Sequence, residues 1–134
     1  MNRQTYLMLA SMMAAVVVAL LISARPADEI VTRKGNTTLI NTTQLGAKVR
    51  GYRGTTPVLI HIEKNKVVKV EALPNVESPK FFARAKAVLL QFEGLTVNKA
   101  LKVEVDGVSG ATFSSDALAK NVKLGLEYYK KNSK

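Results

Sequence analysis

The sequence predicts an α+β domain, built on a small antiparallel sheet with packed helices and preceded by an N-terminal transmembrane or signal-anchor helix. Three observations predict this class. Apolar and polar side chains alternate along residues 58–72, which is typical of a β-hairpin with one buried face. Residues 78–94 and 115–130 have the apolar spacing of amphipathic helices. Residues 4–24 carry no charged side chain and are almost wholly apolar.

As a helix, the segment 4–24 has about the length needed to cross the roughly 30 Å hydrocarbon core of a bilayer. A helix buried in a protein core would normally carry one apolar stripe, whereas this segment is apolar on all sides. A cleaved signal peptide would have a shorter apolar run and a small residue where Ile22 or Arg25 stands. These features favour an uncleaved signal anchor.

The anchor sets the expected domain boundaries. Residues 1–24 would form the anchor, 25–36 a linker and 37–134 the folded domain. Basic residues flank the span on both sides, so the Lys and Arg count leaves the orientation open. Because a short N-terminal tail ahead of the span resembles an export signal, we expect a single-pass protein of the cell membrane with its domain outside the cytoplasm.

Strands are expected at 37–42, across the hairpin 58–72, and at 101–105, where apolar residues again alternate with charged ones. The Gly- and Pro-rich segment 51–57 predicts a turn before the hairpin. His61 lies on the more polar face of the hairpin, so we interpret it as structural. The side chains expected on the buried face are Val58, Ile60, Ile62, Val68, Val70 and Ala72.

The first predicted helix has signals at both ends: Ser78 suits the N-cap, Pro79 the first helical position and Gly94 the left-handed stop. Its core stripe is Phe81, Phe82, Ala85, Val88, Leu89 and Phe92. A short element at 96–101 follows this helix. The last helix, 115–130, has the stripe Leu118, Ala119, Val122, Leu126 and Tyr129, and lysines near its C-terminus suit the helix dipole.

Composition excludes several classes of function. The formal net charge of +10 would attract acidic partners, anionic lipid or nucleic acid. The basic residues are scattered and do not alternate with aromatic ones, which favours a basic surface beside an anionic membrane over nucleic-acid binding. The absence of cysteine excludes disulfides, iron–sulfur clusters and c-type haem in this chain. With one histidine and no catalytic or metal-binding cluster, redox chemistry would require an organic cofactor.

The segment 106–112, Asp-Gly-Val-Ser-Gly-Ala-Thr, precedes the last predicted helix. Its glycines allow a ligand to approach the backbone closely, and the N-terminus of a helix favours a phosphate. A tight turn with Ser114 or Ser115 as the N-cap would explain the same residues. The segment is neither a dinucleotide-binding fingerprint nor a P-loop, because the spacing differs and the lysine is missing.

This segment resembles the Asp-x-x-(Ser/Thr)-Gly-Ala-Thr attachment motif of the covalent FMN-binding domain family. The resemblance extends over about 51–129, since Gly-Tyr-Arg-Gly at 51–54 is similar to the family's Gly-Tyr-x-Gly and Asn-Val-Glu-Ser-Pro at 75–79 to its Asn-x-Glu-(Ser/Thr)-Pro. Such domains occur in peripheral subunits of Rnf-type and sodium-pumping NADH:quinone oxidoreductases and in small exported flavoproteins. Many members continue the second motif with Gly-Leu, where this chain has Lys80 and Phe81.

The resemblance implies that a flavin transferase, using FAD and Mg²⁺, attaches FMN to Thr112 through a phosphodiester. The residues it implies for the recognition turn around the phosphate are Asp106, Ser109, Gly110 and Ala111. The residues it implies near the flavin ring are Asn75, Glu77, Ser78 and Pro79, and Phe81 could stack on the ring.

From these features we expect a membrane-anchored electron-transfer flavoprotein with covalent FMN, a carrier and not an enzyme. Its expected partners are the flavin transferase, the membrane through the N-terminal helix, and membrane-bound or exported redox proteins, with no nucleic acid. The alternative is an exported, non-redox binding or adhesion module of the same fold that carries no flavin.

Overall fold

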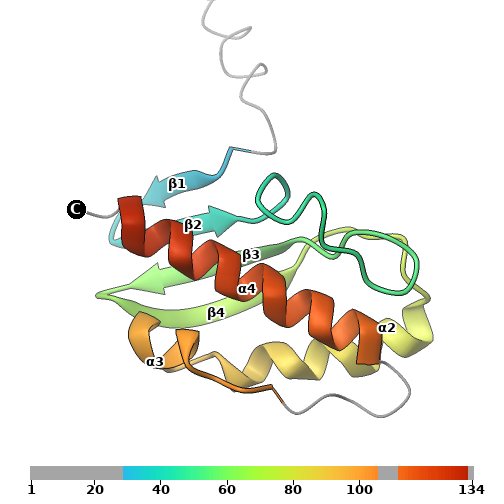
Figure 1. Cartoon of the computed structure of the whole chain (residues 1–134). Helices are drawn as coiled ribbons and strands as arrows, with labels where there is room; N and C mark the ends of the chain where they lie inside the picture. The colour runs from blue at the N-terminus through green and yellow to red at the C-terminus, as the bar shows by residue number, and fades with distance from the viewer. Residues whose placement is uncertain (1–28, 106–111, 133–134) are drawn as a thin grey trace, which may run out of the picture.

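A four-stranded antiparallel sheet with the strand order β1-β2-β3-β4 forms the framework of the protein (Figure 1). The computed structural model describes residues 29–105 and 112–132, so the expected anchor at 1–24 and the turn residues 106–111 lie outside it. With the helices that pack on the sheet, the described residues confirm the predicted α+β class. The strands are β1 (Val31–Lys34), β2 (Thr37–Asn41), β3 (Val58–Glu63) and β4 (Lys66–Ala72).

Strand β1 occupies residues that the sequence places in the linker 25–36. It pairs antiparallel with β2, and Val31 lies opposite Ile40. The four residues of β1 do not alternate clearly between apolar and polar, so the sequence gives little indication of a strand here. Pairing with β2 stabilises this short strand, and an amphipathic pattern does not. The folded part of the chain therefore includes residues before position 37.

A register shift changes the buried face of β4. His61 pairs with Lys69 but Ile62 pairs with Val67, which leaves Val68 as the extra residue of a β-bulge. Val67 is fully buried and Val68 is 49% exposed, so the expectation that Val68 faces the core is wrong. The other expected core residues of β3 and β4 are buried, apart from Ala72, which is half-buried against the core.

The helical elements are α2 (Pro79–Ala85), a 3₁₀ helix η1 (Lys86–Gln91), α3 (Val97–Leu101) and α4 (Thr112–Asn132). The predicted helix over 78–94 is thus an α-helix followed by a 3₁₀ helix. Pro79 begins α2 as expected, but the Ser78 side chain makes no capping hydrogen bond. Within the described ranges, no helix has the length and apolar character needed to cross a membrane.

The expected strand at 101–105 is absent from the described fold, where Leu101 ends α3 and residues 103–105 have no regular structure. A further strand would have to pair with the outer edge of β4, but residues 94–96 already bond to that edge. Gly94 takes a positive φ of 83° and turns the chain onto that edge. The Gly94 amide then donates to the Val67 carbonyl, and the Val67 amide to the Leu95 carbonyl, at 2.7 and 2.8 Å.

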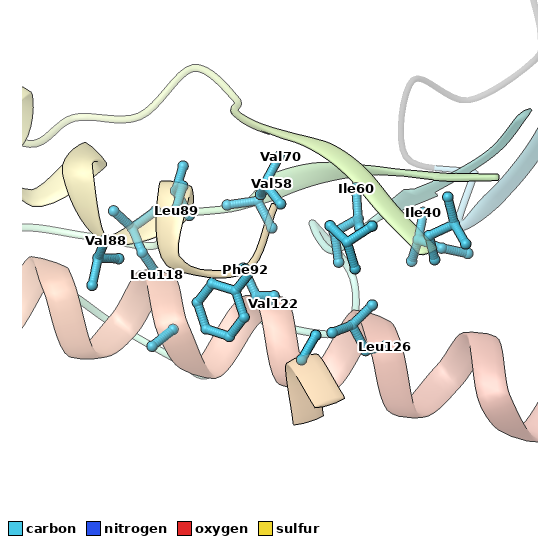
Figure 2. Packing of buried hydrophobic residues seen from close by; sticks show 14 of the residues in the cluster. Ile40, Val58, Ile60, Val70, Val88, Leu89, Phe92, Leu118, Val122 and Leu126 are labelled. Atoms are coloured by element: carbon cyan, nitrogen blue, oxygen red, sulfur yellow. The ribbon is translucent and has the colours of Figure 1, made fainter. Parts of the chain in front are cut away.

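Helix α4 crosses one face of the sheet and buries its apolar stripe against β2 and β3 (Figures 1 and 2). Phe92, from the chain after η1, lies between this helix and the sheet and is fully buried. The predicted stripe of α4 is confirmed, with Tyr129 only partly buried at its C-terminal end. The same helix also contacts α2, η1 and α3, so the core is enclosed between the sheet and the helices.

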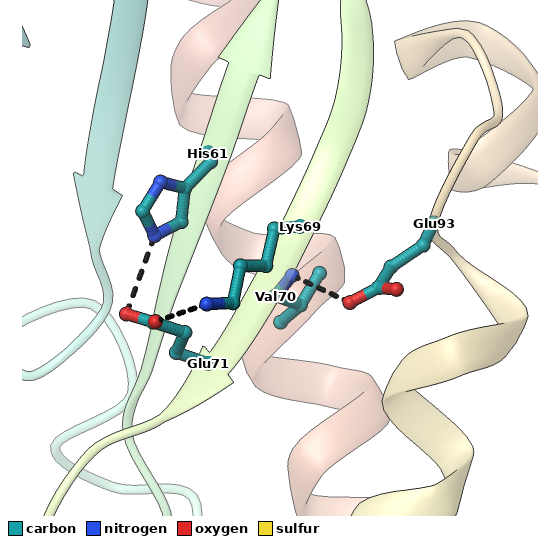
Figure 3. Close-up of polar contacts among 5 residues, drawn as sticks. All are labelled: His61, Lys69, Val70, Glu71 and Glu93. Atoms are coloured by element: carbon teal, nitrogen blue, oxygen red, sulfur yellow. Dashed lines mark hydrogen bonds and ion pairs between the residues drawn. The ribbon is translucent and has the colours of Figure 1, made fainter.

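The opposite face of the sheet carries a small polar cluster (Figure 3). Glu71 pairs with Lys69 at 2.7 Å and with His61 at 3.3 Å, which agrees with a structural role for His61. The hydrogen bond from Lys69, followed by that from His61, lowers the pKa of Glu71, and the same bond to Glu71 raises the pKa of Lys69. At the β4 edge, the Val70 amide donates to Glu93 Oε1 at 3.1 Å.

Candidate functional site

A cavity of about 390 Å³ opens beside the N-terminal end of α4. Among the described residues, three segments that are distant in sequence form it: the loop containing Tyr52, the Glu77–Phe81 segment that includes the start of α2, and the first turn of α4. Its volume lies within the roughly 300–1,000 Å³ range of small-molecule sites. The lining residues are Tyr52, Glu77, Ser78, Phe81, Thr112, Phe113 and Ser114.

Thr112 is the first residue of α4, and its side chain is exposed at the cavity. The first backbone N–H groups of a helix have no acceptor within the helix, and the helix dipole adds a partial positive charge at this end. A hydroxyl in this position is accessible from solvent and lies where an attached phosphate is electrostatically favoured.

Three aromatic side chains give the cavity flat apolar walls. Tyr52 is 75%, Phe113 69% and Phe81 47% exposed, so the expectation that Phe81 belongs to the core stripe of its helix is wrong. The rings of Tyr52 and Phe113 lie 6.4 Å apart between centroids and are tilted by 38°. Exposed aromatic side chains that share one cavity favour a planar, partly apolar ligand, because ring faces stack on such a ligand.

Glu77 forms the polar floor of the site and is only 6% exposed. Its Oε1 accepts a hydrogen bond from the Ser114 hydroxyl at 3.2 Å, and its Oε2 accepts one from the Arg53 amide at 2.8 Å. Its own amide donates to Asn75 Oδ1 at 3.0 Å, which closes a local Asx turn. The carboxylate therefore connects all three segments that form the cavity.

The turn at 51–54 is built around this carboxylate. The Gly51 amide donates to the Gly54 carbonyl at 2.7 Å, which closes the turn. A Cβ at position 51 would overlap Glu77 Oε1, so only glycine allows the carboxylate to lie this close to the backbone. The Gly-Tyr-Arg-Gly motif thus brings Tyr52 to the cavity while its first glycine makes room for Glu77.

A second polar contact ties the same loop to the middle of α4. Asn121 is fully buried, and its Oδ1 accepts from the Thr42 hydroxyl at 3.0 Å. Its Nδ2 donates to the Ala117 carbonyl at 2.9 Å and lies 3.4 Å from the Thr56 hydroxyl. Since Thr42 and Thr56 flank the loop, this network fixes the loop ends while Glu77 fixes the turn.

The structure brings Thr112, Glu77, Ser78 and Phe81 of the expected site together at one cavity. Asn75 accepts a hydrogen bond from the Glu77 amide, and Pro79 begins α2; neither residue is among those that line the cavity. The expected turn residues Asp106, Ser109, Gly110 and Ala111 lie outside the described residues.

Among the described lining residues, sequence reasoning missed Tyr52 and Phe113, and it gave Ser114 only as a hydroxyl donor or an N-cap. Tyr52 and Phe113 stand inside or next to motifs, but no periodicity indicates that exposed rings from such distant positions meet. The residue type of Ser114 suggests an N-cap. It lies instead inside the first turn of α4, where its hydroxyl bonds to Glu77.

An FMN group fits this set of residues. The aromatic walls suit a planar isoalloxazine ring, and the exposed hydroxyl of Thr112 at the start of α4 suits its phosphate. The cavity is open to solvent at the exposed rings of Tyr52 and Phe113, so a ring held there would keep an accessible edge.

Comparison with known proteins agrees with this chemistry. A search of curated proteins finds no match to the chain. The family model described as "FMN-binding domain" matches residues 51–127, which is more than half of the sequence. The match begins at the Gly51 turn, includes all the cavity-lining residues that the structure describes, and ends in α4. The chain belongs to the FMN-binding domain family.

Proposed function

We propose that the protein is a membrane-anchored electron carrier whose FMN is covalently bound to Thr112. The observation that supports this most directly is the position of Thr112, exposed as the first residue of α4 and lining an aromatic-walled cavity. Membership of the FMN-binding domain family supports the cofactor. The apolar segment 4–24 supports the anchor, and the export-like arrangement of the N-terminus supports a domain outside the cytoplasm.

The proposed attachment is a phosphoryl transfer that depends on access to one hydroxyl. Thr112 Oγ1 forms a bond to the phosphorus on the riboflavin side of FAD, the pyrophosphate bond breaks, AMP leaves, and the hydroxyl proton passes to solvent. A separate transferase with Mg²⁺ supplies the catalysis. Thr112 meets the main requirement on this chain, because an exposed hydroxyl at the end of a helix is open to a second protein.

A covalent link suits an exported carrier. Outside the cytoplasm, a cofactor that dissociates would be lost, and a phosphodiester prevents this loss. When bound, FMN supplies one- and two-electron redox chemistry. The chain itself tethers the phosphate at Thr112, flanks the ring with Tyr52, Phe81 and Phe113, and leaves an edge open for electron exchange.

Positive charge beside the cavity supports docking of an acidic redox partner. Arg50 and Arg53 on the loop and Lys80 and Arg84 on α2 are exposed on two of the segments that form the site. Opposite charges speed encounter between proteins, and salt screens this effect. We therefore expect electron exchange with the partner to slow as ionic strength rises. A rate that is independent of salt would remove the docking proposal and leave flavin binding unaffected.

The proposed attachment is tested by coexpression with a flavin transferase, followed by denaturation and intact-mass measurement. The wild-type protein should stay yellow after denaturation and gain the mass of FMN less one water. Thr112→Val should lose both the colour and the added mass. Thr32→Val, the same change on half-buried β1, is the matched control and should keep both. Unmodified wild-type protein in the presence of active transferase would favour the non-redox binding module.

A further inference from the structure

The least expected group at the site is the carboxylate of Glu77. It is 6% exposed, and burying a charged group is costly unless hydrogen bonds compensate for the lost water. Carrying electrons on a flavin requires no acidic side chain of the protein. A carboxylate in the floor of a cavity that receives an anionic phosphate would even repel this ligand at close range. Its presence therefore indicates a role other than direct contact with the phosphate.

The contacts of Glu77 indicate what this role is. One carboxylate oxygen accepts from Ser114 in the first turn of α4, and the other accepts from the Arg53 amide in the 51–54 turn. The absence of a Cβ at Gly51 creates the space for the first oxygen. One side chain thus joins a loop, the start of a helix and its own segment ahead of α2.

These contacts act on residues on which the proposed attachment depends. Ser114 lies two positions after Thr112, so holding the Ser114 hydroxyl fixes the turn that presents Thr112 and Phe113. Arg53 follows Tyr52, so holding the Arg53 amide fixes the backbone that carries the Tyr52 ring, whose centroid lies 6.4 Å from that of Phe113. Two of the three aromatic walls, Tyr52 and Phe113, and the attachment hydroxyl therefore lie on segments that one carboxylate holds together.

We propose that Glu77 is the positioning residue of the flavin site: its buried carboxylate clamps the 51–54 turn to the first turn of α4 and so sets the place of Thr112 between the aromatic walls. This inference rests on the proposed function, because attachment of flavin to Thr112 is its main readout. A positioning role predicts that flavin attachment depends on the hydrogen bonds of Glu77 and does not depend on its negative charge.

The substitution Glu77→Gln separates these two properties. A glutamine side chain has the same length, and its amide oxygen can accept from the Arg53 amide while its NH₂ group donates to the Ser114 oxygen. Alanine removes both bonds. Glu71→Ala is the matched control, because Glu71 also pairs with two partners but lies on the open face of the sheet, away from the cavity.

The experiment measures the kcat/KM of flavin transfer onto each purified apo variant by one transferase with FAD and Mg²⁺. Glu77→Ala should lower kcat/KM by about 10- to 100-fold, because misplacement by about 1 Å can cause losses of this size. Glu77→Gln and Glu71→Ala should stay close to the wild-type value. Ser114→Ala removes one of the two hydrogen bonds, so its kcat/KM should lie between those of Glu77→Ala and the wild type. If Glu77→Ala does not fold, Ser114→Ala takes its place in the comparison.

The inference would be overturned if folded Glu77→Ala had the wild-type kcat/KM for flavin transfer. An equal loss of kcat/KM in Glu77→Ala and Glu77→Gln would also overturn it. Amide hydrogen exchange provides a readout that needs no flavin. The Arg53 amide should lose protection in Glu77→Ala and keep it in Glu77→Gln, and unchanged protection in both variants would overturn the inference. If the wild-type protein accepts no flavin while amide hydrogen exchange follows this pattern, the proposed function is wrong, but Glu77 still holds the 51–54 turn against α4.

Discussion

Two glutamates of this protein each contact two partners, in very different surroundings. Glu71 lies on the open face of the sheet, where its side chain is 40% exposed and pairs with Lys69 and His61 (Figure 3). Glu77 is 6% exposed beneath the cavity and bonds to the Ser114 hydroxyl and the Arg53 amide. Glu71 connects side chains of adjacent strands, whereas Glu77 connects segments far apart in the sequence.

The difference shows where geometry matters in this fold. Around Glu71 the two strands are already held by their backbone ladder, and an exposed ion pair adds little to it. Around Glu77 no regular sheet of the described residues joins the loop to α2 or α4, so side-chain hydrogen bonds set the geometry. The region that depends on specific polar contacts is the one that forms the cavity.

The largest effect should come from removing the carboxylate of Glu77, and removing that of Glu71 should have a much smaller one. Glu77→Ala leaves the buried Ser114 hydroxyl and the partly buried Arg53 amide without their acceptor and should lower the free energy of unfolding by about 1–3 kcal/mol. Glu71→Ala removes an exposed pair and should cost less than about 1 kcal/mol. Urea unfolding of both variants measures the difference. Equal losses would contradict the comparison between the two regions.

A second prediction tests the close approach of Glu77 to the backbone. Gly51→Ala should destabilise the protein by about 1–3 kcal/mol, because the added Cβ overlaps Glu77 Oε1 and lies 3.2 Å from Thr56 Cγ2. In the Glu77→Ala background the main overlap is gone, so the same change should cost clearly less. A double-mutant cycle from urea unfolding gives this coupling. Additive losses would show that the carboxylate and the glycine are independent.

The smallest effect concerns the pH dependence of the open face. Because the pKa of Glu71 is lowered in the folded protein, its contribution to stability is present above its ordinary value of 4.5 and is lost as pH falls below it. Because the pKa of Lys69 is raised, its contribution is present below 10.5 and is lost as pH rises above it. The small stability gap between wild type and Glu71→Gln should therefore exist at neutral pH and close in acid. A gap that is unchanged in acid would contradict this assignment.

Residue patterns predict the parts of the fold in which one local rule acts alone. The stripe of α4 and the β3 core face follow simple periodicity, and Gly94 ends its helical segment as its residue type indicates. The bulge that turns Val68 outward breaks the period of two without any signal in the sequence. The alternation at 101–105 arises because Val103 and Val105 pack partly against the core without pairing in the sheet.

The candidate site shows the same limit. Motif resemblance indicates Thr112, and the same resemblance indicates the segment that contains Glu77 and Phe81. It does not indicate that Glu77 faces inward to Ser114 and Arg53, since a motif names residues without their partners. The meeting of Tyr52 with Phe113 depends on how the loop packs against α4, which is a tertiary property.

The central claim, esterification of FMN at Thr112, is tested most directly by fragmentation of one tryptic peptide from protein purified from its native host. Cleavage after Lys102 and Lys120 gives a peptide that contains Ser109, Thr112, Ser114 and Ser115, every serine and threonine of the segment that enters α4. The account predicts that the fragment ions place the added mass of FMN less one water on Thr112. The added mass on another residue, or its absence while the transferase is active in that host, would contradict the account.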